Sequence, residues 1–576
     1  MDQRLSGARV VRVSGPLVEI EGLERVAMSE MVALGPHRLP GEVVAIRGAS
    51  VSAQSYEYTG GLRAGDQVAA LGRPLSARLG PHLLGGVFDG LLRPLSGAPV
   101  WLAPGGSRGQ VDSVLEWAPK VGLGETVDEG TVLGTLPGPG LIEQRVLVPP
   151  RLRGPVEWLA PPGQRAAAEP VARVGGVEVS PVVDWPIRRP RPVRERRDAV
   201  EPLLTGQRVI DAVFPVARGS TVAVPGGFGT GKTMLLQQIA KWCAAHVIVY
   251  VGCGERGNEM ADVLAELAEL TDPTTGRRLA ERTVIIANTS NMPMMAREAS
   301  IYSGVTVAEY FRDMGYDAVV IADSTSRWAE ALREFGSRSG ALPAEEGYPA
   351  TLPSALAAFY ERAGRVRTLG GTEASVTIIG AVSPPGGDTT EPVTAQTERF
   401  VRGMWSLDRD LAYARHYPAV AWSGSFSRDA EHLGVWYSRN GDPGWSRRRA
   451  RVTGLLAEAD RLSDLAALVG VNSLPGHERV ALLGGRLLRE GVLQQSALSA
   501  NDARCGPAKT AALVEAVLAV VDSCESLVGE VGVTAAEIEE LDFSPLLRAA
   551  QETAPEDVDG VTARRDQVLS RLEGLR

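Results

Sequence analysis

Eight consecutive residues carry the clearest chemical pattern in this chain. They fit the phosphate-binding pattern G-x-x-x-x-G-K-[ST] and are Gly226, Gly227, Phe228, Gly229, Thr230, Gly231, Lys232 and Thr233. An apolar run at 220–225 precedes them, and a helical pattern follows from residue 232. A loop between a strand end and a helix start turns backbone N–H groups and the positive end of the helix dipole toward an anion. Lys232 would then bridge the outer phosphates of a nucleotide, and Thr233 would hold Mg²⁺.

Lysine is rare in this chain, which gives the pattern added weight. Of its 60 lysines and arginines only four are lysines, namely Lys120, Lys232, Lys241 and Lys509. At that frequency, a lysine would seldom fall by chance on the position that the pattern requires. The structural alternative is a glycine-rich turn that binds no ligand.

Acidic residues follow two later apolar runs that are typical of buried strands. Glu255 comes after the run 247–251, and Asp323 comes after the run 317–322. A carboxylate beside the γ-phosphate can orient and polarise an attacking water, so Glu255 is the candidate general base or water-positioning group, and the adjacent Arg256 could offset phosphate charge. Asp323 fits a carboxylate that holds Mg²⁺ through the water shell of the metal. Each residue also has a purely structural alternative. Glu255 could be an acid at the start of a helix, in an ion pair with Arg256, and Asp323 could be the N-cap of a helix.

Strand-like and helix-like segments alternate around these residues. Strands are predicted at 220–225, 246–251, 282–288, 317–322 and 374–381, and helices at 232–244, 257–270, 294–314 and 326–335. Such alternation predicts a mostly parallel sheet with helices on both faces, in which ligands bind at the carboxyl ends of the strands.

The remaining sequence predicts three further parts. Short apolar runs separated by glycine and proline turns indicate a small β-barrel at 1–72, and β-like texture indicates an insert at about 110–185. The insert lies within a connecting segment, 73–195, which ends in a basic, proline-rich run. That run is either a stiff linker or a grip for nucleic acid or acidic lipid. The α/β domain is expected at 196–425 and an all-α domain at 426–576.

Composition excludes several classes of protein. At 576 residues the chain is too long for one core, and its net charge of −9 argues against nucleic-acid binding as the main role. No apolar stretch is long enough to span a membrane, and the N-terminus lacks the apolar core of a signal peptide. Four scattered cysteines do not suit a disulfide framework or a zinc site. We therefore expect a cytoplasmic protein.

Several motifs together resemble the catalytic alpha (A) subunits of V-type and archaeal-type rotary ATPases. The strongest are Gly252-Cys-Gly-Glu-Arg-Gly-Asn-Glu-Met260 and Ala322-Asp-Ser-Thr-Ser-Arg-Trp-Ala-Glu-Ala331. Others are Leu204-Thr-Gly-Gln-Arg-Val-Ile-Asp211, Glu345-Glu-Gly-Tyr-Pro349, Phe359-Tyr-Glu-Arg-Ala-Gly364, Val382-Ser-Pro-Pro-Gly-Gly-Asp388, Arg415-His-Tyr-Pro-Ala419 and Gly85-Gly-Val-Phe-Asp-Gly-Leu-Leu-Arg-Pro94. The resemblance covers most of the chain, is strongest at 200–425 and is weak after about 495.

The resemblance implies a multidomain fold: an N-terminal β-barrel, a β-rich bulge insert, a RecA-like P-loop nucleotide-binding domain and an all-α C-terminal domain. It implies ATP or ADP with Mg²⁺ at the site and an ATP-driven enzyme that translocates H⁺ or Na⁺, or makes ATP in reverse. The expected partners are a central rotor stalk, a peripheral stalk, a membrane ion-translocating sector and the B subunit. Three A subunits would alternate with three B subunits on the cytoplasmic face of the cell membrane, and each B subunit would supply an arginine finger.

The family's site roles carry over to Lys232, Thr233, Glu255, Arg256 and Asp323. Near the nucleotide base the chain departs from the family, because Ser496-Ala-Leu-Ser499 stands where Asn-Ala-Phe-Asp is usual. Tyr417, at a position where phenylalanine is usual, is therefore the better candidate for stacking on the base. Two other functions stay open from the sequence: a nucleotide-binding subunit without turnover, and a related hexameric motor such as a secretion ATPase or an RNA translocase.

Overall fold

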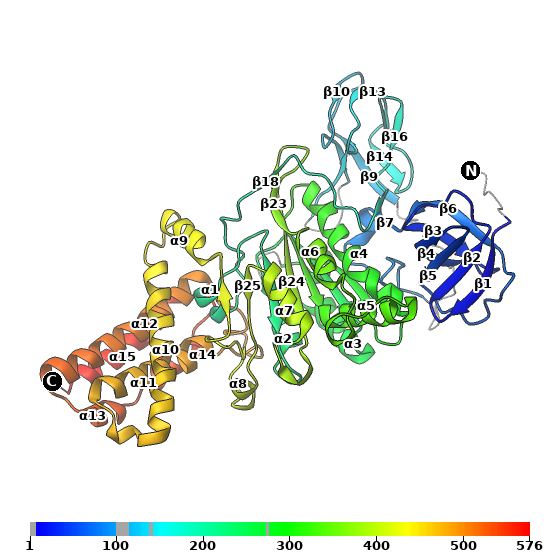
Figure 1. The fold of residues 1–576 in the computed structure, drawn as a ribbon. Helices are drawn as coiled ribbons and strands as arrows, with labels where there is room; N and C mark the ends of the chain where they lie inside the picture. Colours follow the sequence, from blue (N-terminus) through cyan, green and yellow to red (C-terminus); the bar gives the residue numbers. More distant parts are fainter. Residues whose placement is uncertain (1–6, 99–113, 137–141, 272–275, 576) are drawn as a thin grey trace. The chain divides into compact units, whose positions relative to one another are not determined.

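The computed structural model describes residues 7–98, 114–136, 142–271 and 276–575 (Figure 1). They divide into two compact units. The first unit comprises Met1–Asp198, Ala245–Val382 and Thr389–Phe400, and the second comprises Ala199–Ala244, Ser383–Asp388 and Val401–Arg576. No helix among the described residues is both long enough and apolar enough to cross a membrane.

The first unit begins with the predicted β-barrel, drawn in blue in Figure 1. Six antiparallel strands follow the order β1-β2-β5-β4-β3-β6. Hydrogen bonds from Val10 N to Asp66 O and from Gly65 N to Val10 O join the first strand to the segment before the last. The strands are β1 (Arg9–Ser14), β2 (Leu17–Glu21), β3 (Glu30–Leu34), β4 (Leu39–Arg47), β5 (Ser50–Ser55) and β6 (Val68–Pro74). The hydrogen bonds of Val10 bring the two ends of the sheet together into a barrel.

The predicted insert has its own hydrophobic core. Its two four-stranded sheets have the orders β10-β13-β15-β16 and β12-β11-β9-β14, and they enclose Trp117, Leu133 and Val156, which are fully buried. The strands are β9 (Val114–Pro119), β10 (Thr126–Val127), β11 (Val132–Leu136), β12 (Gln144–Leu147), β13 (Gly154–Leu159), β14 (Gly163–Ala166), β15 (Ala172–Val174) and β16 (Val177–Val179). Positions 110–113 and 137–141 of the predicted insert lie outside the described residues.

A parallel sheet forms the centre of the first unit. Its neighbours run β24-β22-β20-β21-β8, and β23 and β18 continue it antiparallel from β24. The strands are β8 (Val87–Phe88), β18 (Glu195–Arg197), β20 (Val247–Cys253), β21 (Thr283–Asn288), β22 (Ala318–Asp323), β23 (Gly364–Arg367) and β24 (Glu373–Val382). Every residue of β20, β21 and β22 is buried, which explains their unbroken apolar sequences.

Helices cover this sheet, among them α4, which packs against β20, β22 and β24. The helices of this part are α3 (Gly257–Glu269), α4 (Met294–Asp313), α5 (Thr325–Ser339), α6 (Leu352–Tyr360) and α7 (Pro392–Phe400). The helices expected at 257–270, 294–314 and 326–335 are confirmed, with ends that differ by at most four residues. The sequence analysis did not identify α6 or α7.

The basic, proline-rich run before residue 198 is held inside the first unit by ion pairs. Arg188 pairs with Glu298 at 2.7 Å and with Glu42 at 3.3 Å, and Arg191 pairs with Asp313 at 2.6 Å. The run joins the α/β part to β4 of the barrel through these contacts. Since Arg188 and Arg191 pair with acidic residues of the same unit, the structure favours the linker interpretation over a binding site for nucleic acid or acidic lipid.

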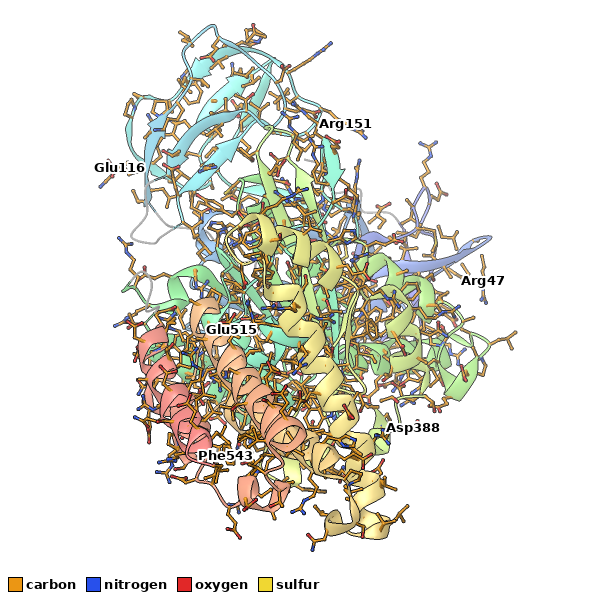
Figure 2. The ribbon with its side chains drawn as sticks, turned by 90° about the vertical axis from the view of Figure 1, so that its left-hand side faces the viewer. Arg47, Glu116, Arg151, Asp388, Glu515 and Phe543 are labelled. Atoms are coloured by element: carbon orange, nitrogen blue, oxygen red, sulfur yellow. The ribbon has the colours of Figure 1, made fainter. Side chains whose placement is uncertain are left out.

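The second unit contains a short sheet and a helical C-terminal part. Strand β19 (Thr221–Pro225) pairs parallel with β25 (Gly403–Met404), which pairs antiparallel with β26 (Phe426–Ser427). The helices are α1 (Arg208–Val213), α2 (Lys232–Trp242), α8 (Arg409–Tyr413), α9 (Ala430–Arg439), α10 (Trp445–Val469), α11 (Gly476–Leu488), α12 (Pro507–Ser526), α13 (Ala535–Glu539), α14 (Ser544–Glu552) and α15 (Val558–Glu573). Figure 2 labels Glu515 on α12 and Phe543 just before α14. Barrel, insert, α/β part and helical end all appear, so the predicted fold class is confirmed.

One buried arginine joins the start of this unit to its helical part. Arg208, on α1, donates to the carbonyl oxygens of Val492 and Gln494 and forms an ion pair with Asp502. The side chains of both charged partners are at most 1% exposed. A buried ion pair of this kind is costly to break, because the remaining charge has neither a partner nor water.

We therefore expect Arg208→Met to lower the free energy of unfolding by about 3–5 kcal/mol, since it leaves the Asp502 carboxylate buried without its cation. Urea unfolding of the full chain at neutral pH measures this loss. The matched control is Arg208→Met combined with Asp502→Asn, which should recover much of the stability. If the free energy of unfolding of Arg208→Met lay within about 1 kcal/mol of the wild type, the ion pair would not be important for stability.

Candidate nucleotide-binding site

The phosphate-binding pattern forms a loop between a buried strand and a helix, as the sequence predicts. All five residues of β19 are buried, and α2 begins at Lys232. Gly229 and Gly231 have φ angles of 80° and 81°, which glycine adopts without a steric cost. Phe228, which lies in the sequence between the end of β19 and Gly229, is 89% exposed. The geometry is therefore that of an anion-binding loop at a helix N-terminus.

Contacts within the second unit fix the curve of this loop. The Thr230 hydroxyl donates to Gly227 O at 2.8 Å, across the loop. At its start, Gly226 forms a parallel bridge with Leu407, whose N–H donates to Pro225 O at 2.8 Å. A Cβ on Gly226 would lie 2.8 Å from the Thr230 hydroxyl oxygen, so this close packing requires glycine.

Lys232, the expected phosphate-bridging residue, contacts a side chain from a distant part of the sequence. Its Nζ donates a hydrogen bond to Ser383 Oγ. Ser383 begins the segment Ser383–Asp388, whose last residue is labelled in Figure 2. Sequence reasoning did not name Ser383 as a site residue, although it lies in one of the motifs that carry the family resemblance. The contact gives the lysine a defined position beside the loop.

Tyr417, the residue predicted to stack on the nucleotide base, lies against the same loop. A Cβ on Gly231 would lie 3.0 Å from Cε1 of the Tyr417 ring, which is 40% exposed. The Tyr417 carbonyl accepts a hydrogen bond from Gln495 N at 2.7 Å, so the segment that departs from the family pattern begins beside it. Leu498, on that segment, is 95% exposed. An exposed aromatic ring thus lies against the phosphate loop, and the segment that begins beside it carries an exposed apolar side chain.

The predicted acidic residues lie in the first unit, at the carboxyl ends of neighbouring parallel strands. Gly252 pairs with Asp323 in the register of β20 and β22, and Glu255 follows β20 by two residues. The N-cap of α5 is Ser324, so the structure does not support the alternative in which Asp323 caps that helix. Asp323 is 1% exposed and accepts a hydrogen bond from the Tyr250 hydroxyl at 3.2 Å.

The surroundings of Asp323 keep its hydroxyl partner protonated. Burial, followed by the charge of Asp323, raises the pKa of the Tyr250 phenol well above its ordinary value. Burial also raises the pKa of the Cys253 thiol, at the end of β20, to about 12. Cys253 is therefore a buried thiol and not a nucleophile.

Two arginines that the sequence analysis did not select lie beside the candidate general base. Gly254, with φ of 76°, precedes Glu255, and a Cβ there would lie 2.9 Å from Arg327 Cβ and 3.0 Å from Arg297 Nε. Arg327 belongs to the motif Ala322–Ala331, so its place in that motif could have identified it as a site residue. By contrast, Arg256 pairs with Glu259 at 4.0 Å on an exposed surface, where an ion pair contributes little.

The structure thus gathers the predicted residues in two groups. The phosphate loop, Lys232, Thr233 and Tyr417 belong to the second unit, and Glu255, Arg256 and Asp323 belong to the first. The first group has the backbone and cationic donors of an anion site, and the second has the carboxylates of a water- or metal-binding site.

Comparisons with known proteins match four parts of the chain to domains of one family. Residues 206–427 match the ATP synthase alpha/beta family nucleotide-binding domain, and 434–533 match the C-terminal domain of V and A type ATP synthase. Residues 10–72 match the beta-barrel domain of the alpha/beta family, and 110–188 match the barrel-sandwich domain of its alpha/beta subunits.

Curated relatives extend this similarity to nearly full length. The chain is 50% identical over 525 residues to the V-type ATP synthase alpha chain of Nitrosococcus oceani, covering 89% of each chain. It is 48% identical to the V-type ATP synthase alpha chain of Anaeromyxobacter sp. (strain K), over 98% of this chain and 99% of that one. It is 46% identical to the A subunit of the A-type ATP synthase of Saccharolobus solfataricus, over 89% of each.

A solved structure shares the fold. The ATPase EscN from the type III secretion system of enteropathogenic E. coli superposes with a TM-score of 0.64 at 22% identity, over 89% of this chain and 100% of that chain. At this identity the likeness concerns the fold alone.

Tyr417 offers a test of where the base binds. Tyr417→Ala should weaken ATP binding about tenfold, because stacking of a base on an aromatic ring is worth about 1–3 kcal/mol. Tyr417→Phe, which keeps the ring, should bind ATP like the wild type, and inorganic triphosphate should bind all three proteins equally. Calorimetric titration measures these affinities. Equal losses of ATP and triphosphate binding would instead indicate a damaged phosphate loop.

Proposed function

The chain belongs to the family of V-type ATP synthase alpha chains and A-type ATP synthase A subunits, the catalytic subunits of rotary ATPases, and from this premise we propose how its own residues process ATP. The nucleotide is ATP or ADP, as for the family's nucleotide-binding domain. We assign phosphate binding to the loop Gly226–Thr233 with Lys232, base stacking to Tyr417 and water activation to Glu255.

One observation favours this assignment over a subunit that binds nucleotide without turnover. The chain combines a lysine-bearing phosphate loop at the end of β19 with a half-buried carboxylate, Glu255, two residues beyond β20. Two arginines surround the backbone just before that carboxylate. A protein that only binds nucleotide needs the loop, whereas hydrolysis or synthesis also needs a base that handles a proton of water.

The proposed hydrolysis step balances in atoms and charge. Glu255 accepts a proton from a water whose oxygen attacks the γ-phosphorus, and the bond from that phosphorus to the bridging oxygen of ADP breaks. The products are ADP and inorganic phosphate, and the proton passes from the carboxyl group to solvent or phosphate. Lys232 and the loop amides stabilise the charge that moves onto the phosphate oxygens. Synthesis is the same step reversed.

The oxygen ligands present suit Mg²⁺, which prefers hard oxygen donors and keeps several of its waters. We propose that the Thr233 hydroxyl would contact Mg²⁺ directly. Asp323, which is buried, would contact the metal through one of its waters. Bound Mg²⁺ would supply neutralisation of charge on the phosphate oxygens. Arg256, now paired with Glu259, would contribute positive charge only after leaving that exposed pair.

Membership in the family supports a multisubunit complex, and we propose its form from the resemblance. Three copies of this chain would alternate with three B subunits around a central rotor stalk, with a peripheral stalk and a membrane ion-translocating sector. The complex would lie on the cytoplasmic face of the cell membrane and couple ATP turnover to H⁺ or Na⁺ transport. Each B subunit would complete a site with an arginine finger.

The two catalytic assignments predict different failures. Glu255→Gln should still bind ATP with Mg²⁺ but slow hydrolysis by the assembled complex at least about 100-fold, the usual scale for a lost general base. Lys232→Ala should instead lose most nucleotide binding, because it removes the cation at the outer phosphates. Steady-state phosphate release and calorimetric binding separate the two effects. Turnover near the wild-type rate with Glu255→Gln would refute the proposed base.

If a B subunit supplies the arginine finger, this chain alone should have almost no ATPase activity. A verified monomer should bind ATP but hydrolyse it roughly 10³–10⁵-fold more slowly than the reconstituted complex, the range that a supplied arginine finger is worth. Phosphate release by the monomer, before and after the partner B subunits are added, measures the difference. Full activity in the monomer would show that the site needs no partner residue.

A further inference from the structure

Besides Lys232, a second positively charged side chain lies beside the phosphate loop, on the side of β25. Leu407 forms the bridge to Gly226, and two residues later the chain enters α8 at Arg409. This path brings Arg409 next to the first turn of the loop. All of these residues belong to the second unit, so the arrangement does not depend on the first.

Two glycines from separate segments face the Arg409 guanidinium. A Cβ on Gly227 would lie 3.4 Å from Arg409 Nη2, and a Cβ on Gly387 would lie 3.8 Å from the same nitrogen. Gly227 belongs to the phosphate loop, and Gly387 belongs to the segment that begins with Ser383, the hydrogen-bond partner of Lys232. The guanidinium therefore lies near both segments that adjoin the phosphate-binding lysine.

The side chain of Arg409 is exposed. Within the described parts of the chain it forms no ion pair with an acidic residue. Other arginines of the same unit are paired: Arg402 with Asp429 at 2.6 Å, and Arg448 with Glu515 at 2.8 Å. An unpaired arginine on a surface is ordinarily just solvated. Here it adjoins a loop whose backbone binds anions, so its charge acts on whatever that loop holds.

We propose that Arg409 is a positioning residue for the polyphosphate chain of the bound nucleotide, acting through its charge from the outer side of the loop. This inference rests on the proposed function of the loop. Since attraction grows with the charge of the ligand and falls with salt, Arg409 favours ATP over ADP and ADP over AMP, most strongly at low ionic strength.

The test uses the full-length chain and calorimetric titration with ATP, ADP and AMP at low and at high salt. Arg409→Met removes the charge and keeps much of the stem, whereas Arg409→Lys keeps the charge. Arg447→Met is the matched control, because Arg447 is an exposed arginine on α10 whose loss changes the net charge equally. Lys232→Ala reports on the loop itself.

Arg409→Met should weaken ATP binding about threefold to tenfold at low salt, the scale of one screened charge near a protein surface. The loss should shrink at high salt and be clearly smaller for AMP than for ATP, while Arg409→Lys and Arg447→Met should stay within about twofold of the wild type. An unchanged affinity with Arg409→Met, or an equal loss for AMP, would overturn the inference. If Lys232→Ala had no effect on ATP binding, the proposed function itself would fail, and this inference with it.

Discussion

A phosphate-binding loop works only if its backbone N–H groups stay turned toward the anion while water competes for them. In this protein the loop follows a fully buried strand and leads directly into α2. Within the loop, the Thr230 hydroxyl donates to Gly227 O. At the start of the loop, Gly226 forms a β-bridge with Leu407. In the proposed site, Lys232, Tyr417 and Arg409 would add their side chains to a backbone that is already shaped, so that little ordering would remain for binding.

The distribution of charge follows from this constraint. Lysine, a compact charge on a flexible stem, occurs four times in the chain. One lysine stands at the loop, and another, Lys509, is fully buried, where it donates to the carbonyl oxygens of Ala550 and Thr553. Arginine supplies the remaining cations, and buried pairs such as Arg208 with Asp502 fix the helical part. The loop thus carries the cation best suited to a point contact with phosphate, while arginine forks provide structural pairing.

Strong local patterns allowed much of the fold to be predicted. The strands β19 to β22 and the helices α2 to α5 have long apolar or amphipathic signals, and the predicted segments match them closely. The short helix α8 carries little pattern of its own, and the sequence analysis did not identify it. The hydrogen bond of Lys232 with Ser383 and the approach of Arg409 to Gly227 involve residues far apart in sequence, which local patterns cannot reveal. Motifs predicted roles for Glu255 and Asp323, and the strand register shows that both lie at the carboxyl ends of neighbouring strands.

The most direct measurement is a structure of the chain assembled with its partner subunits, with a non-hydrolysable ATP analogue and Mg²⁺ bound. Our assignment predicts that Lys232 Nζ leaves Ser383 Oγ and lies within hydrogen-bond distance of the outer phosphates. It also predicts that the Glu255 carboxylate faces the γ-phosphate through one water. A nucleotide bound away from Gly226–Thr233, or a γ-phosphate whose water contacts no carboxylate of this chain, would contradict it.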